Sequence, residues 1–221
     1  HSCYTFFEIA AVWCGPAQKI LSSINSQNVS ESFRQSHRGR VLIVPHLGCW
    51  ELMALWAVQQ SGLMCLYKPQ SNAAFDQFLF QARSRTGIEM LPTNTAGLRQ
   101  MSRGLKQGKT VIILPDQRPG KMGAEIMHEF FGHSASSSPL IYKLSRSTDS
   151  DFFIAAMFRN DRLNGFDLEI NPLQHDLLSA DQHQSLQYLN QQMESLIRKH
   201  PEQYQWGYRR FPAELYQQQL N

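Results

Sequence analysis

The stretch "RVLIVPHLGCWELMALWAVQQSG" at positions 40–62 decides the fold. Its first part is a short apolar run, and its second part spaces apolar residues as an α-helix does, up to Gly62. A strand that leads through a short turn into a helix is the repeating unit of a layered α/β protein. Pro45 and Gly48 favour the turn, because proline disfavours helix before it and glycine accepts unusual backbone dihedrals.

The same alternation continues along the rest of the chain. Strands alternate with helices of about 10 to 15 residues, which is typical of a layered α/β domain whose largely parallel sheet is flanked by helices. A long loop is predicted after residue 115. The predicted strands are 41–44, 63–67, 88–92, 110–115, 152–158 and 166–170, and the predicted helices are 3–14, 26–37, 48–62, 72–87, 95–108, 138–146 and 181–200.

The composition fits one globular domain, or at most two small ones. Of the 221 residues, 42% are apolar and 18% are charged, so a sizeable core can form with fewer solvating charges than usual. The net charge of +3 excludes a histone-like or strongly acidic protein, and we predict no nucleic-acid partner. Four cysteines without a C-x-x-C pair indicate reduced thiols in a domain that faces the cytoplasm.

The N-terminal helix predicted at 3–14 is apolar but contains Glu8. It is far shorter than the roughly 20 residues that span a bilayer. We favour an amphipathic helix packed on the domain over a helix that lies on a membrane surface. The chain does not begin with Met, so we expect further sequence upstream.

The hexapeptide "HLGCWE" at 46–51 places a base and a carboxylate at the exit of a strand. Positions i and i+5 lie about 140° apart on a helix, so the two side chains can meet only if His46 is in the loop and Glu51 is in the first helical turn. A carboxylate on one ring nitrogen would fix the tautomer and leave the other nitrogen free to accept a proton. The helix N-terminus would supply N–H donors to a developing oxyanion. Ordinary strand-exit residues are the alternative.

Other motifs are weaker. "GLKQGKT" at 104–110 is one residue too short for a phosphate-binding loop and joins a helix to a strand, which is the wrong order. "GHSAS" at 132–136 resembles the elbow of a serine hydrolase, with Ser134 as nucleophile, but no helix follows directly. The histidines do not have the spacing of metal ligands, and His128 and His133 form only a loose cluster, so no metal is predicted.

Four more stretches carry a resemblance to a known family. They are "YKPQSN" (67–72), "LPDQRPG" (114–120), "EFFGHSASS" (129–137) and "PEQYQWGYRRFP" (201–212). Together with "HLGCWE", and in this order, they resemble the late acyltransferases of lipid A biosynthesis, the lauroyl/myristoyl transferase family. That family belongs to the wider glycerolipid acyltransferase group with a His-x4-Asp/Glu motif. The resemblance covers about 40–212.

The resemblance implies a glycerol-3-phosphate-acyltransferase-like fold and an O-acyl transfer. An acyl-carrier-protein thioester would donate a fatty acyl group to a hydroxyl of a lipid A precursor, with no cofactor and no covalent acyl-enzyme. His46 would be the general base and Glu51 its orienting partner. We expect alanine at position 51 to lower turnover strongly with little loss of stability. The family acts at the cytoplasmic face of the inner membrane, usually with an N-terminal anchor.

The resemblance also implies residues that bind the substrates. Lys68 stands where the family usually has arginine, which keeps the charge but loses bidentate geometry. The arginines are expected to meet lipid A phosphates or the acidic carrier protein, with solvated surface charge as the alternative. The implied substrate-binding residues are Lys68, Asn72, Asp116, Gln117, Arg118, Arg209 and Arg210.

We therefore divide the chain into an N-terminal helical segment at 1–38, an acyltransferase catalytic domain at 39–212 and a C-terminal tail at 213–221. The expected partners are the acyl carrier protein, the lipid A precursor and the membrane surface. Three alternatives stay open: an acyltransferase for another lysophospholipid or glycolipid, a serine hydrolase that uses Ser134, and a non-catalytic lipid-binding protein.

Overall fold

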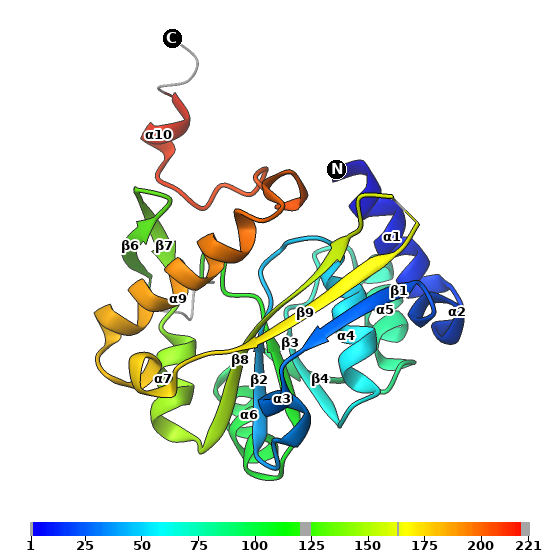
Figure 1. Cartoon of the computed structure of the whole chain (residues 1–221), viewed down its shortest axis with the longest axis horizontal. Coiled ribbons are helices and arrows are strands. Elements are labelled where there is room, and N and C mark those ends of the chain that lie inside the picture. Colours follow the sequence, from blue (N-terminus) through cyan, green and yellow to red (C-terminus); the bar gives the residue numbers. More distant parts are fainter. Residues whose placement is uncertain (1, 120–124, 163, 218–221) are drawn as a thin grey trace.

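The computed structural model describes residues 2–119, 125–162 and 164–217. Within them, one seven-stranded sheet has helices on both faces (Figure 1). Its strand order is β1-β9-β8-β2-β5-β3-β4, and every neighbouring pair is parallel except β8 and β9. The predicted α/β class, with a largely parallel sheet flanked by helices, is confirmed.

Most element bounds lie close to those predicted. The strands of the sheet are β1 (Ile24–Val29), β2 (Gly39–Ile43), β3 (Leu63–Tyr67), β4 (Glu89–Pro92), β5 (Thr110–Ile113), β8 (Ser150–Arg159) and β9 (Phe166–Pro172). The α-helices are α1 (Ser2–Cys14), α2 (Ala17–Leu21), α3 (Glu31–Gln35), α4 (Trp50–Val58), α5 (Ala73–Ser84), α6 (Thr95–Lys106), α7 (Leu140–Ser147), α8 (His175–Ser179), α9 (Gln182–Ile197) and α10 (Ala213–Gln217).

Alternate residues of the central strands face two separate helical layers. In β2, Val41 and Ile43 belong to one hydrophobic core and Leu42 to the other, as the two-residue period of a strand requires. The first core also contains side chains of α6, α7, α8 and α9, and the second those of α1, α3 and α4. Both faces of the strand are buried, which explains its unbroken apolar run.

The predicted helix at 26–37 is wrong. Residues 24–29 form the edge strand β1, parallel to β9, and only Glu31–Gln35 is helical. The side chains of Ser26, Gln27 and Asn28 are exposed, so the strand carries no alternating apolar pattern. Backbone hydrogen bonds to β9 hold β1 in place, and such bonds do not require any pattern of side chains in the sequence.

The long loop predicted after residue 115 contains a β-hairpin of β6 (Ile126–Phe130) and β7 (His133–Ser137). Its turn places both Phe131 and Gly132 at positive φ, 51° and 75°. A phenylalanine rarely adopts this conformation. Here the N–H of Phe131 donates to Glu194 of α9 at 2.6 Å, and the guanidinium of Arg198 lies over its ring. Contacts with α9 therefore support a turn that local sequence does not favour.

The described residues begin and end with a helix. Helix α1 lies on α4 and α5 with Val12 buried, which confirms the predicted packing of this segment on the domain. Within the described residues, we find no helix with both the length and the apolar character to cross a bilayer. The predicted tail at 213–221 begins as α10, and its positions 218–221 lie outside the described residues.

Candidate active site

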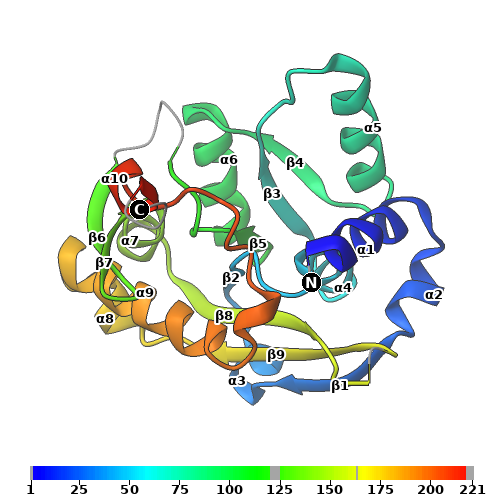
Figure 2. The same ribbon diagram turned by 90° about the horizontal axis from the view of Figure 1, so that it is seen from above.

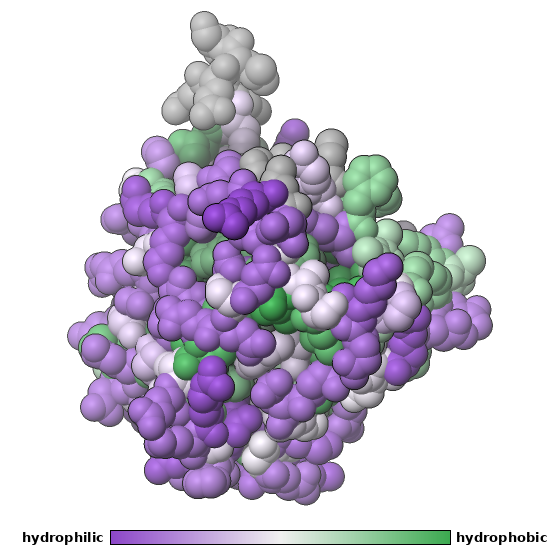
Figure 3. All heavy atoms as spheres, turned by 45° about the vertical axis from the view of Figure 1, so that its right-hand side comes forward, coloured by the Kyte–Doolittle hydropathy of each residue, from purple (hydrophilic) through white to green (hydrophobic). Residues whose placement is uncertain are grey.

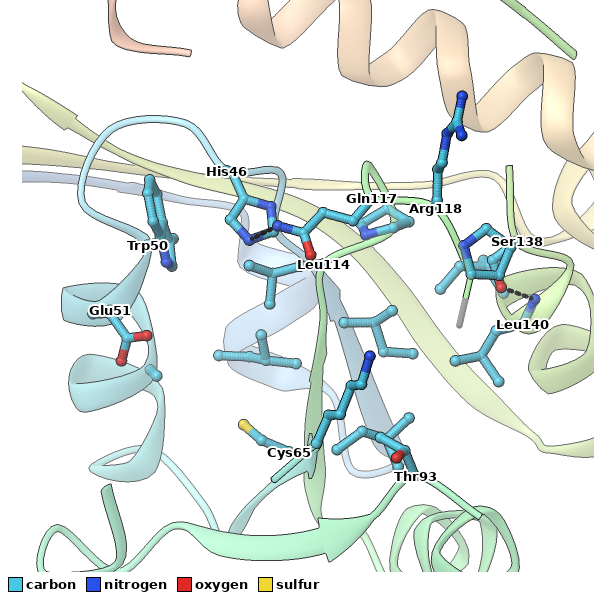
Figure 4. Close-up of a pocket in the computed structure, with 18 of the residues that line it drawn as sticks. His46, Trp50, Glu51, Cys65, Thr93, Leu114, Gln117, Arg118, Ser138 and Leu140 are labelled. Atoms are coloured by element: carbon cyan, nitrogen blue, oxygen red, sulfur yellow. Dashed lines mark hydrogen bonds between the residues drawn. The ribbon is translucent and has the colours of Figure 1, made fainter. Parts of the chain in front are cut away.

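A pocket opens where β2 and β5 end. These strands are parallel neighbours with Ile43 opposite Ile113, so the segments that follow them lie side by side. Ligands of such sheets commonly bind beyond the carboxyl ends of the strands. The pocket has a volume of about 390 Å³ and mixes an apolar wall with polar groups at its rim (Figure 4). Its lining includes His46, Trp50, Glu51, Ala54, Cys65, Leu66, Lys68, Arg83, Ile88, Thr93, Ile112, Ile113, Leu114, Gln117, Arg118, Ser138, Leu140 and Ile141.

A rigid turn presents His46 to this pocket. Gly48 has φ of +63°, and a Cβ at this position would lie 2.0 Å from the carbonyl oxygen of Met157. Only glycine fits such a conformation and such a close approach. The backbone N–H of Gly48 donates to the carbonyl of Gln203 at 3.2 Å, and that of Gln205 donates to the carbonyl of His46 at 3.0 Å. The predicted use of Gly48 in the turn is confirmed.

The His46 imidazole is held from both sides. Its Nδ1 lies 2.8 Å from Oδ1 of Asp116, and the backbone N–H of His46 donates to Oδ2 of the same carboxylate, also at 2.8 Å. Because a carboxylate can only accept, Nδ1 carries the proton. Nε2 then has a free lone pair, which accepts from the side-chain amide of Gln117 at 3.1 Å (Figure 4). This is the tautomer that a general base needs.

Asp116 stays ionised although it is buried. Burial acts to raise its pKa, but the electrostatic interaction with His46, the hydrogen bonds from the His46 ring and backbone, and the charge of Arg210 together outweigh burial. The pKa of Asp116 therefore lies below its ordinary value. Burial and the neighbouring Asp116 charge raise the pKa of Tyr204, so that its phenol stays neutral.

The predicted contact between Glu51 and His46 is wrong. Glu51 does lie in the first turn of α4, as predicted. Its carboxylate, however, accepts from Nε1 of Trp13 at 3.0 Å and forms an ion pair with Arg83 of α5. The guanidinium supplies a full charge and two donors, whereas the imidazole is already bonded to Asp116. The carboxylate that orients His46 is Asp116, and a catalytic role of Glu51 stays a prediction.

Comparison with known proteins identifies the family. The family model described as bacterial lipid A biosynthesis acyltransferase matches residues 2–212. The chain belongs to this family.

Curated relatives share about a quarter of their aligned residues with this chain and are longer than it. The lipid A biosynthesis palmitoleoyltransferase of Escherichia coli K12 is 26% identical over 206 residues, which are 92% of this chain and 66% of the relative. The myristoyltransferase of the same organism is 26% identical over 195 residues, 87% of this chain and 59% of the relative. The chain thus spans about two thirds or less of the length of these two relatives.

Of the seven substrate-binding residues that the acyltransferase resemblance implied, the structure brings only part together. Lys68, Gln117 and Arg118 line the pocket beside His46. Figure 4 shows Arg118 extending away from the apolar wall, and its guanidinium donates to the carbonyl of Phe211 at 2.6 Å. Asn72 instead caps α5, because its side chain accepts from the N–H of Phe75 at 3.0 Å.

The two arginines near the C-terminus have different environments. The Arg209 side chain is exposed, with its guanidinium over the ring of Tyr216 at 5.9 Å. Arg210 is only 3% exposed, and it donates to the carbonyl of Ser136 at 3.1 Å and to Asn190 at 2.9 Å. The prediction that Arg210 meets a substrate phosphate is therefore wrong, since this side chain links the hairpin to α9 below the surface.

The elbow of a serine hydrolase is absent from this part of the chain. Ser134 is exposed on the second strand of the hairpin, opposite Glu129, rather than in a tight turn between a strand and a helix. Within the described residues, no group of three His, Cys, Asp or Glu side chains could hold a metal ion.

Sequence reasoning missed the two partners of Glu51, which are Arg83 and Trp13, and the phenol of Tyr204 beside Asp116. Arg83 and Trp13 are 32 and 38 positions from Glu51, and each lies in a helix whose pattern indicates only a buried face. No short motif connects them with the site. An arginine on the helix predicted at 72–87, beside the residues that form its buried face, is the one signal that could have suggested a buried carboxylate partner.

Proposed function

We propose that this chain transfers a fatty acyl group from an acyl-carrier-protein thioester to a hydroxyl group of a lipid A precursor. The observation that carries the proposal is the His46–Asp116 pair at the rim of a largely apolar pocket, in a chain of the lipid A acyltransferase family. The printed names of the relatives describe palmitoleoyl and myristoyl transfer in lipid A biosynthesis, which supports a lipid A precursor as acceptor.

In the proposed mechanism, His46 acts as general base without a protein nucleophile. The acceptor hydroxyl replaces the Gln117 amide on Nε2, and Nε2 takes its proton as the oxygen attacks the thioester carbonyl. Asp116 keeps Nδ1–H in place and stabilises the imidazolium. The new ester C–O bond forms, the C–S bond breaks, and the proton on Nε2 passes to the leaving thiolate.

The apolar wall of the pocket fits a fatty acyl chain. The pocket lining includes Ile112, Ile113, Leu114, Leu140 and Ile141. Burial of a methylene group stabilises by about 0.8 kcal/mol, so an acyl chain gains affinity along such a wall. Lys68 and Arg118 line the pocket and take part in no ion pair of the described residues, whereas Arg83 is paired with Glu51, so Lys68 and Arg118 are placed to meet a phosphate group of the acceptor.

Asp116→Asn is expected to lower kcat by about 10²–10⁴-fold, because an amide N–H can face Nδ1 and favour the wrong tautomer. The measurement is steady-state transfer from a myristoyl-carrier thioester, with Asp149→Asn as control, since Asp149 is an exposed carboxylate whose ion pair among the described residues is with Arg38. Turnover within about threefold of the parent would contradict the orienting role.

Asp116→Asn should also change how the free energy of unfolding depends on pH. A carboxyl group whose pKa is lowered by folding contributes stability above its unfolded pKa, and this contribution is lost as the pH falls through the folded value. The difference in unfolding free energy between parent and Asp116→Asn should therefore narrow on acidification in urea titrations.

We also propose that the protein works at the cytoplasmic face of the inner membrane. Phe6 and Phe7 of α1 are 73% and 72% exposed, and Phe75 and Phe78 of α5 are exposed and stacked. Figure 3 shows apolar side chains gathered over α1. Aromatic side chains on an exposed helix are typical of insertion into a lipid interface.

Phe6→Ser/Phe7→Ser is expected to reduce binding to phosphatidylglycerol vesicles about tenfold or more, because two buried phenyl rings contribute over 1.4 kcal/mol. Vesicle flotation measures this binding. Leu177→Ser, at an exposed apolar residue of α8, is the control. Equal flotation of all three proteins would refute the assignment of α1.

A further inference from the structure

Helix α6 carries three cations along one exposed line. Arg99, Arg103 and Lys106 are spaced i, i+4 and i+7, which places them on one side of the helix, and all three are exposed. We call these three residues the basic stripe. The ion pairs of the described residues involve other cations, so the charges of the stripe are not compensated within the described chain.

The acidic group beside the stripe is already neutralised. Glu89 accepts from Nζ of Lys109 at 2.7 Å and from the side-chain amide of Gln100 at 2.6 Å. Two hollows of about 380 and 490 Å³ flank the stripe, and Arg99 and Arg103 line both of them. The surface is therefore grooved and positive, and its cations are free to meet an acidic partner.

The basic stripe runs away from the rim of the pocket. Thr93 lines the pocket, and α6 begins two residues later, at Thr95. At about 1.5 Å per residue, the three cations lie roughly 6, 12 and 17 Å along the helix from its start. Figure 2 shows α6 next to β4, with α5 beyond the strand. A protein bound to α6 could thus place a flexible arm that bears the thioester in the pocket, while the protein itself stays outside the pocket.

We propose that the basic stripe docks the acidic carrier protein that delivers the acyl thioester, an inference that rests on the proposed function. Complementary charge steers a protein partner and fixes its orientation more than it adds affinity. A membrane surface fits less well, because the exposed large apolar side chain of α6 is Leu98 alone, whereas the exposed aromatic residues lie on α1 and α5. The stripe and the aromatic surface therefore serve different partners.

The test compares two donors of the same acyl group, myristoyl-carrier protein and myristoyl-pantetheine. Arg99→Glu/Arg103→Glu should raise KM for the carrier donor roughly tenfold or more, with kcat changed by less than about twofold. KM for the pantetheine donor, which lacks the acidic protein, should stay within about twofold of the parent. The neutral variant Arg99→Gln/Arg103→Gln should give an intermediate rise and guards against a folding defect caused by charge reversal.

The matched control is Lys143→Glu/Arg146→Glu, which reverses two exposed cations on α7. Three results would overturn the proposal. They are an equal rise in KM in this control, an equal loss of kcat/KM with both donors in Arg99→Glu/Arg103→Glu, or an unchanged KM for the carrier donor in that variant. Reduced binding of phosphatidylglycerol vesicles with intact carrier kinetics would also overturn it, because the stripe would then contact lipid.

Direct binding separates this inference from the proposed function. Fluorescence anisotropy of labelled myristoyl-carrier protein measures docking without turnover. If the unaltered protein transfers no acyl group but binds the carrier and loses binding in Arg99→Glu/Arg103→Glu, the proposed reaction fails and the docking surface stands. If the unaltered protein transfers the group from pantetheine but does not bind the carrier, the docking surface fails and the acyl transfer stands.

Discussion

Replacing His46 by alanine should lower kcat about 10³-fold, because the acceptor hydroxyl loses the group that removes its proton. The pocket walls and the carrier-binding face are unaffected, so KM for the acyl donor should change little. The backbone N–H of residue 46 still donates to Asp116, which limits the structural effect of the change. The measurement is transfer of a myristoyl group to a hydroxyacylated lipid A precursor, with far-UV circular dichroism as a check on folding.

Ser134→Ala is the control for this experiment and discriminates between reaction classes. Ser134 is exposed on the hairpin and no described contact joins it to His46, so we expect turnover within about twofold of the parent. A serine hydrolase requires the opposite result: loss of turnover in Ser134→Ala, with His46→Ala less affected. That pattern would refute the general-base mechanism.

Replacing Glu51 by alanine should destabilise the fold by about 3 kcal/mol, because removal of one partner leaves a charged guanidinium uncompensated in a mostly buried position. The side chain of Glu51 is 8% exposed and that of Arg83 is 28% exposed. For a chain of this size, the change corresponds to a fall in Tm of roughly 6–12 °C. The position of Glu51 at a strand exit had suggested little loss of stability, and the ion pair is the reason to expect more.

A double-mutant cycle isolates the pair. Glu51→Ala/Arg83→Met removes both charges and should recover about 1 kcal/mol or more of the loss, since the methionine can occupy the apolar wall without an unpaired charge. Urea unfolding measures all four proteins. A loss in Glu51→Ala below about 1 kcal/mol, or no recovery in the double variant, would show that the ion pair carries little stability.

The same cycle tests whether Glu51 takes part in catalysis. If Glu51 only supports the pocket wall, then turnover at a temperature where all variants are folded should fall less than in Asp116→Asn. If its carboxylate acts on the reacting groups, turnover should fall strongly in both Glu51→Ala and the double variant, whatever their stability.

Much of the architecture was predictable because the periodic spacing of apolar residues along the chain indicates strands and helices. The unbroken apolar run at 41–44 indicated a strand covered on both faces, and the helical spacing after Gly48 indicated the helix that begins beside His46. These two features place His46 in a loop and Glu51 in a first turn, as the structure shows. Edge strand β1 and the hairpin after β5 were missed, because exposed polar strands and a turn at Phe131 depend on distant backbone partners.

The sequence by itself determined which residues lie at the strand exits, since burial of one face or both imposes a period on every element. Only the tertiary structure decided how the charged groups pair. Asp116 reaches His46 across 70 positions because β2 and β5 are adjacent in the sheet, and Arg83 reaches Glu51 because α4 and α5 both pack against α1. A buried charge takes whichever partner the strand order and helix packing bring nearest, and spacing along the chain does not record that order.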